Sequence, residues 1–201
     1  MQTEFRTLCA MLGLVFWMGT ASAVAPTGTV VAVSGSCSAH GRALKSGDAV
    51  QVSDMVDVPA GGHLKLQMAD GSVISVGPDS SMAVISYNVG GAGRQAKLSL
   101  TQGVLRAVVA PVGGPSTFEV STAVGRASVA SESADWFIRA QADSAQVGVL
   151  AGTVDLTSTT TGQSVSIPAH WGTRLETGLD PVLPRIWAQT EFDAVIRLTG
   201  G

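Results

Sequence analysis

The chain has 201 residues, of which 45% are hydrophobic and 13% are charged, and its formal net charge is −3. This composition is typical of one globular domain and excludes an intrinsically disordered chain. There is no basic run, which argues against a nucleic-acid partner and against a membrane contact made through a polybasic patch. The 24 glycines and the many Val, Ser and Thr residues favour strands and turns over helices.

The N-terminal segment 1–23 predicts a signal peptide, and therefore a periplasmic or secreted protein. A short apolar run, LCAMLGLVFWMG (8–19), is followed by TASA (20–23), the small residues that a signal peptidase recognises. Cleavage after Ala23 fits best, because a cut two residues later would lie next to Pro26. The apolar core has 12 residues, against the roughly 20 that span a bilayer. This favours cleavage over the alternative, an uncleaved anchor, and leaves no integral membrane span.

Cysteine usage excludes a disulfide scaffold in the mature chain. Cys9 lies inside the apolar run rather than after it, which disfavours a lipoprotein, and cleavage would remove this residue. Cys37 then remains as a single thiol that cannot form an internal disulfide. We interpret Cys37 as a small, partly buried residue, and the alternative is an intermolecular disulfide.

From Thr27 onward the hydrophobic pattern alternates with a period of two, which is typical of half-buried strands. In HLKLQM (63–68) every second residue is apolar, and AKLSLT (96–101) repeats the pattern. Similar runs are TGTVVAV (27–33), DAVQV (48–52), TFEV (117–120), DWFIRA (135–140), AQVGVL (145–150), GTVDLT (152–157) and QSVSI (163–167). Short strands separated by turns predict a mostly β fold. We expect two packed twisted β-sheets, arranged as a sandwich or a short solenoid-like stack.

The stretch 63–81 brings a carboxylate, a hydroxyl and an imidazole close together in sequence, and poses a choice between a catalytic site and a turn. Asp-Gly between alternating runs is a strong hairpin signal. A three-residue loop, Ala69-Asp70-Gly71, places the apolar residues of both strands on one face, as the pleat requires. This register pairs Met68 with Ser72, Leu66 with Ile74, and Leu64 with Val76.

The same loop gives Gly71 a left-handed conformation, which glycine adopts without steric cost. His63 lies at the far end of the hairpin, roughly 20 Å from the turn at the rise of a strand, so it cannot serve Ser72 within one hairpin. We therefore interpret the stretch as a turn, in which Asp70→Asn would be nearly silent because Asn also suits the position.

No other segment carries a catalytic, metal or cofactor signature. The sequence lacks a nucleophile elbow, a phosphate-binding loop and a zinc-protease motif. His40, His63 and His170 have no partner at metal-ligand spacing. Asp135-Trp136 and His170-Trp171 are polar–aromatic neighbours, but successive strand residues point to opposite faces. We assign no catalytic, cofactor or metal residues, expect no cofactor and no enzyme, and leave the binding residues open.

The C-terminal segment changes to helical spacing after Pro181 and Pro184. Its apolar residues Ala188, Phe192, Val195 and Ile196 form one narrow stripe, and the pattern ends at Gly200. This predicts a single amphipathic helix that packs on a sheet as structural cover. The alternative is that the stripe is left bare and binds a partner.

As an ordered series, these strands resemble the FecR family. The resemblance is carried by GTVVAVSG (28–35), LKSGD (44–48), LQMADGSVISVGPDS (66–80), LSLTQGVLRAVV (98–109), FEVSTAVGRASVASESADWFI (118–138), AQVGVLAGTVDL (145–156) and SVSIPAHWGTRL (164–175). It covers about residues 28–178. The resemblance implies a periplasmic sensing domain of the kind found in ferric-citrate-type regulators and in their stand-alone relatives.

The chain also departs from the family pattern. Thr122 is followed by Ala123, where the family often has Thr-Pro, and Ala130-Ser131-Glu132 stands in place of Arg-Gly-Thr. Sigma-regulating members carry a cytoplasmic segment and a membrane span before this domain, whereas only a signal peptide is expected here. The resemblance therefore implies the sensing domain without the regulator, and disfavours direct anti-sigma action.

Three segments are expected: a signal peptide at 1–23, a FecR-like all-β domain at 24–178, and a C-terminal extension with the helix at 179–201. The first functional hypothesis is a non-enzymatic periplasmic sensing or binding module that contacts a protein partner or an envelope ligand. The alternative is a glycan- or peptidoglycan-binding β-domain. That alternative needs aromatic side chains on one exposed face, and few aromatic residues remain once the core is filled.

Overall fold

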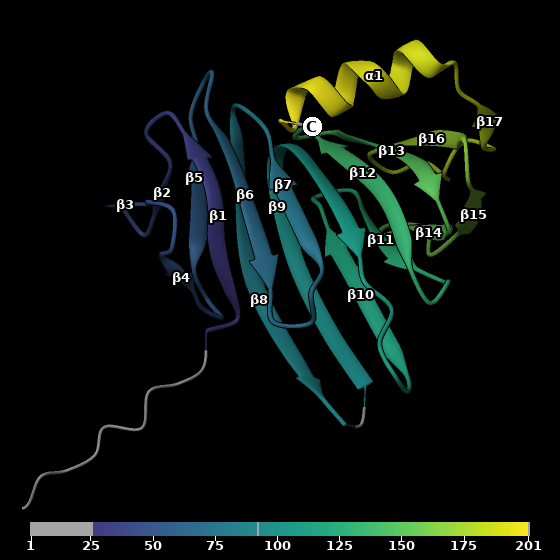
Figure 1. Cartoon of the computed structure of the whole chain (residues 1–201). Coiled ribbons are helices and arrows are strands. Elements are labelled where there is room, and N and C mark those ends of the chain that lie inside the picture. The colour runs from purple at the N-terminus through teal and green to yellow at the C-terminus, as the bar shows by residue number, and fades with distance from the viewer. Residues whose placement is uncertain (1–25, 92, 201) are drawn as a thin grey trace, which may run out of the picture.

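The computed structural model describes residues 26–91 and 93–200 (Figure 1). The expected signal peptide and its cleavage site lie outside this part of the chain. Within it, no helix has both the length and the apolar character needed to cross a membrane.

The strands form two sheets that face each other. The first sheet consists, in spatial order, of β4 (Ala49–Val50), β1 (Gly28–Ser34), β6 (His63–Met68), β7 (Val73–Val76), the second part of β9 (Gly93–Val109), β12 (Ala134–Ala140), β13 (Ser144–Ala151), β16 (Trp171–Glu176) and β17 (Arg185–Ile186). The second sheet consists of β3 (Arg42–Ala43), β2 (Ser38–Ala39), β5 (Met55–Val58), β8 (Ser80–Gly90), the first part of β9, β10 (Ser116–Ser121), β11 (Gly125–Val129), β14 (Thr153–Ser158) and β15 (Ser164–Pro168).

From β6 onward the chain alternates between the two sheets. The pair β6–β7 lies in the first sheet, β8 and the start of β9 in the second, and the end of β9 in the first. The pair β10–β11 then lies in the second sheet, β12–β13 in the first, β14–β15 in the second, and β16–β17 in the first. Strand order in space therefore follows strand order in sequence, and the two layers grow along one axis (Figure 1). This confirms a mostly β fold of two packed sheets with solenoid-like progression and one C-terminal helix.

Strand β9 belongs to both sheets because it bends at Gly103. Its first part pairs with β8, and from Gly103 onward it pairs with β7 and β12. Gly103 has a φ of +95°, and a Cβ there would overlap Ser80. The Ser80 hydroxyl in turn accepts a hydrogen bond from the Val104 N–H at 2.9 Å. A glycine is required at this bend, where the chain changes sheets.

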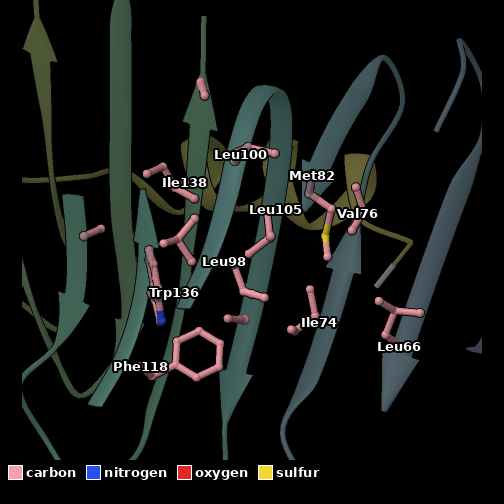
Figure 2. Packing of buried hydrophobic residues seen from close by; sticks show 14 of the residues in the cluster. Leu66, Ile74, Val76, Met82, Leu98, Leu100, Leu105, Phe118, Trp136 and Ile138 are labelled. Atoms are coloured by element: carbon pink, nitrogen blue, oxygen red, sulfur yellow. The ribbon is translucent and has the colours of Figure 1, made fainter. Parts of the chain in front are cut away.

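The core fills the space between the sheets with the inward-facing residues of the alternating runs. Figure 2 shows Leu98 and Leu105 of β9 lying near Phe118 of β10 and Trp136 of β12, and all four are fully buried. The period-two pattern of the sequence thus becomes one continuous hydrophobic layer, which is the main source of stability for a domain of this size.

The hairpin at 63–76 has the register that the sequence predicts. Leu64 lies opposite Val76 and Leu66 opposite Ile74. The Met68 N–H donates to the Ser72 carbonyl at 2.8 Å, which closes a three-residue loop. Gly71 has a φ of +85°, the left-handed conformation expected of it.

We expect Gly71→Val to destabilise the fold by about 1 kcal/mol or more, because a β-branched residue is strained at positive φ. Gly90→Val is a matched control, since that glycine has no positive φ and an added Cβ meets no atom within 4 Å. Thermal melts compare the two variants. Equal melting temperatures for the two would contradict the turn geometry.

Helix α1 (Gln189–Leu198) packs on the outer face of the first sheet. Phe192 and Val195 are buried and Ile196 is partly buried, against Val104 and Phe137 of the sheet. The prediction of a covering helix is therefore confirmed for three of its four apolar residues. It is wrong for Ala188, which is the exposed N-cap and lies outside the buried stripe. Instead of Ala188, the neighbouring Trp187 packs with Phe137, Phe192 and Val195 beneath the helix.

Candidate functional site

The Asp-Gly-Ser turn contains a buried ion pair. The Asp70 carboxylate lies 2.5 Å from the Arg94 guanidinium, and neither side chain is exposed to solvent. Asp70 also accepts hydrogen bonds from the Tyr87 hydroxyl at 2.7 Å, the Ser72 hydroxyl at 2.8 Å and the Ser72 N–H at 2.9 Å. The interpretation that Asp70 serves only the turn is wrong, because its carboxylate is the counter-ion of a buried arginine.

Arg94 extends this network to the loop that follows β9. Its guanidinium donates to the Ala110 carbonyl at 2.8 Å and to the Ser116 hydroxyl at 2.7 Å, and lies 5.6 Å from the centre of the Phe118 ring. The network thus joins the β6–β7 turn to strands β8, β9 and β10. Apart from the Arg94 Nε, the buried polar side-chain atoms of this cluster have hydrogen-bond partners. Such a buried network holds the segments that it joins in place, and we assign this cluster a structural role.

The pKa of the Asp70 carboxyl reflects two opposed influences. Burial, the larger single one, raises the pKa, but the hydrogen bonds from Arg94, Tyr87 and Ser72 together lower it below its ordinary value. The pKa of Tyr87 is raised by burial and by its hydrogen bond to Asp70. Both groups are therefore held in one protonation state at neutral pH.

Sequence reasoning missed Arg94 and Tyr87. Arg94 lies 24 residues from Asp70 along the chain, and no local motif joins them. One signal was available: Arg94 precedes Ala96, Leu98 and Leu100 at even spacing, so it lies on the buried face of its strand. An arginine on that face needs an acidic partner.

The three histidines lie in different parts of the fold. The His63 Nδ1 is 3.1 Å from the Leu198 carbonyl at the end of α1. The His40 Nε2 is 2.9 Å from the Ser53 carbonyl, and His170 is exposed in the β15–β16 turn. In residues 26–91 and 93–200, no three His, Cys, Asp or Glu side chains gather in a way that could hold a metal ion.

The Cys37 thiol is buried and donates to the carbonyls of Ser34 and His63, at 3.3 Å and 3.6 Å. Burial raises the pKa of this thiol. Asp135 makes a two-bond ion pair with Arg106, at 2.9 Å and 2.8 Å, while its neighbour Trp136 points into the core. The polar–aromatic pair is therefore split between two faces, as the pleat predicts.

Aromatic side chains are concentrated inside the molecule. Of those that the structure describes, six are buried and one, Trp171, is half-buried; the buried ones are Tyr87, Phe118, Trp136, Phe137, Trp187 and Phe192. A glycan-binding platform requires several aromatic rings side by side on an exposed face. The described surface offers one partly exposed ring.

Of the ten large hydrophobic residues that are exposed in the described part of the chain, four lie in one short segment between β16 and α1, at an edge of the first sheet. We call this set the apolar edge; its members are Leu179, Val182, Leu183 and Ile186, with exposed fractions of 55%, 53%, 80% and 66%. Four large aliphatic side chains exposed within eight residues are unusual, because a soluble surface rarely leaves such a set unpartnered.

The backbone of the apolar edge is fixed to the sheet. The Val182 N–H donates to the Arg174 carbonyl at 3.0 Å, and the Thr173 hydroxyl donates to the Val182 carbonyl. Farther along, Ile186 pairs with Trp171 in the β16–β17 ladder. The aliphatic side chains are therefore held outward by an ordered backbone.

Two prolines shape the same edge. Pro181 and Pro184 lack an N–H, so the segment cannot offer a continuous ladder to an added strand. Val182, Leu183 and Arg185 help to line a depression of about 250 Å³ that reaches Trp187. This geometry suits contacts made by side chains rather than strand addition.

The fold and these surfaces define an all-β domain in which buried polar groups serve structure and one edge presents apolar side chains. The family described as FecR protein matches residues 54–155, which is just over half of the 201 residues. The chain belongs to the FecR family.

Comparison with solved structures gives the same fold. The chain is similar to two crystal structures of a proposed anti-sigma factor from Parabacteroides distasonis, with TM-scores of 0.56 and 0.57 and sequence identities of 16% and 15%. The match covers 70% of this chain and 63% and 62% of those chains, so it spans less than two thirds of their length. No curated protein matches the sequence.

Proposed function

We propose that this chain is a non-enzymatic sensing or binding module of FecR type, which works in the periplasm and contacts a protein partner through its apolar edge. The observation that carries the proposal is the exposure of Leu183 and Ile186 on a backbone fixed to the sheet. Family membership supports a regulatory or sensing role.

A protein is the partner that suits this surface. The edge combines aliphatic side chains with a rim of ion pairs, Arg185–Glu191 at 2.7 Å and Arg174–Glu176 at 3.1 Å. An apolar centre with a polar rim is the usual anatomy of a protein–protein interface. The similar structures are described as a proposed anti-sigma factor. A protein of that kind also acts by binding another protein.

The glycan-binding alternative has less support, because its aromatic platform would have to be built on Trp171 alone. We therefore propose that the envelope partner of this module is a protein rather than a glycan. The position of the charges also argues against a polyanionic partner, since two of the arginines at the edge are already paired with glutamates.

Site-specific photo-crosslinking tests the proposal. A photoreactive phenylalanine analogue replaces Leu183 in the full chain, expressed in its own host, and adducts are identified by mass spectrometry. We expect one dominant adduct with an envelope protein. The added substitutions Val182→Ser and Ile186→Ser should abolish it while leaving the melting temperature nearly unchanged, because both side chains are exposed.

The matched control places the same analogue at Ile85, which is 54% exposed on the second sheet. This position should give no specific adduct. Equal adducts at both positions, or none at Leu183, would contradict the proposal. An adduct made only with a second copy of this chain would contradict an envelope partner, and would show that the apolar edge serves self-association.

A further inference from the structure

An open cavity of about 650 Å³ lies on the side of the two sheets where several turns meet the end of α1. Its wall combines the turn between β7 and β8, the bend of β9, and the turn between β12 and β13. Leu198 at the end of α1 lines it as well. The volume falls within the range of roughly 300–1,000 Å³ that is typical of small-molecule sites.

The wall of this cavity is held in place by backbone contacts. The Gly77 N–H donates to the Val104 carbonyl at 2.9 Å, and a Cβ on Gly77 would overlap the Leu198 carbonyl. On the other side, the Thr177 N–H donates to the Asp143 carbonyl at 2.9 Å. The cavity is therefore preformed, which lowers the ordering cost of binding.

Arg139 lies in this wall without a partner among the described residues. Six of the eight arginines in 26–91 and 93–200 have a carboxylate within 4.0 Å, and Arg139 has none. Its guanidinium also makes no side-chain hydrogen bond with those residues, although the residue is half-buried. A planar guanidinium presents five donors in a geometry that matches a carboxylate, so an oxyanion is the group that Arg139 would bind.

The rest of the lining has the opposite charge and neutral hydrogen-bonding groups. Asp79 and Asp143 are exposed carboxylates that would bind an ammonium group. The amides of Gln102 and Gln141 can both donate to and accept from a peptide bond. Apolar surface is supplied by Pro78, Val104, Ala140, Ala142 and Leu198.

We infer that this cavity binds a short zwitterionic peptide, with its carboxylate on Arg139 and its amino group on Asp79 or Asp143. The site is separate from the proposed protein contact, because no residue that lines it belongs to the apolar edge. It would give the module a small-molecule input in addition to a protein partner. The inference does not depend on the proposed function.

Calorimetric titration of the purified protein tests this inference with three probes. L-alanyl-L-alanine carries both charges, its N-acetyl derivative lacks the ammonium group, and its C-terminal amide lacks the carboxylate. We expect the unmodified dipeptide to bind at least about tenfold more tightly than either derivative, since each derivative leaves one charged group unpaired. The absence of binding by all three, or equal binding by all three, would overturn the inference.

Two sets of variants assign the charges to positions. Arg139→Gln should weaken the dipeptide about tenfold and leave the amide nearly unaffected, whereas Asp79→Asn combined with Asp143→Asn should weaken the dipeptide and spare the acetylated form. Arg126→Gln, on the second sheet, is the control and should change nothing. If Arg139→Gln weakened the dipeptide and its amide equally, the carboxylate would not lie on Arg139. Thermal melts check that every variant is folded.

Discussion

Asp70→Asn should be among the most destabilising conservative substitutions in this protein, at about 3 kcal/mol or more. Asparagine keeps the shape of the side chain and can still accept a hydrogen bond in the turn, but it leaves Arg94 charged inside the fold without a counter-ion. Both side chains of this pair are shielded from solvent. Removing one charge of such a pair costs far more than the pair contributes as a whole. Urea unfolding curves measure the change in free energy.

The chain contains a matched control in the Asp48–Arg42 pair. Asp48 also lies in a turn, accepts a hydrogen bond from the Lys45 N–H at 2.9 Å, and lies 3.3 Å from its arginine. This pair is exposed, so Asp48→Asn should cost less than about 1 kcal/mol. Similar losses in the two variants would show that burial of the ion pair is not what makes Asp70 important.

The effect of Asp70→Asn should also depend on pH. Because the folded-state pKa of Asp70 is lowered from its ordinary value of 3.8, the carboxylate contributes stability that is fully present above that value. This contribution is lost as the pH falls through the folded-state pKa. The gap in unfolding free energy between the wild type and Asp70→Asn should therefore be constant near neutral pH and narrow below about pH 4.

The local parts of this fold could be predicted from the sequence, because their determinants are neighbours along the chain. The register of the 63–76 hairpin follows from alternation within fourteen residues and one Asp-Gly pair. The ion pair between Asp70 and Arg94 could not be predicted in the same way. This pair forms only because the packing of the two sheets brings the β6–β7 turn, which holds Asp70, against the start of β9, which holds Arg94.

The candidate site illustrates the same limit. From the sequence, the segment with Pro181 and Pro184 shows only that a helical pattern begins after it. Exposure of its aliphatic side chains becomes visible only once the segment is seen hydrogen-bonded to strand β16. The Arg139 cavity likewise draws on four separate stretches of chain. A surface assembled from distant segments leaves no motif in the sequence.

Gly172→Ala should destabilise the protein by several kcal/mol, although alanine is normally better tolerated than glycine in a strand. Gly148 and Gly172 lie opposite each other on β13 and β16, and together they leave a slot on the outer face of the first sheet. The Trp187 indole lies in this slot, 5.6 Å from the ring of Phe137 and 5.6 Å from the ring of Phe192. A Cβ on Gly172 would overlap three atoms of the indole.

The size of the loss follows from what Trp187 holds in place. It is the residue at which the chain leaves β17 and enters α1, and it packs with Phe192 and Val195 of the helix. Trp187→Ala should therefore cost about 3–5 kcal/mol, as large aromatic-to-alanine changes in a core do. Gly172→Ala acts on the same contact by expelling the indole, so its cost should approach this value. Gly113→Ala, where an added Cβ meets no atom within 4 Å, should be nearly neutral.

The double variant Gly172→Ala/Trp187→Ala separates this mechanism from a general disturbance of the sheet. If the Gly172 Cβ harms the protein only by displacing the indole, the double variant should be about as stable as Trp187→Ala alone, since nothing is left to displace. Urea unfolding of the four proteins gives the coupling energy. Additive losses would show instead that Gly172 is needed by the strand itself, and that the slot does not fix the helix.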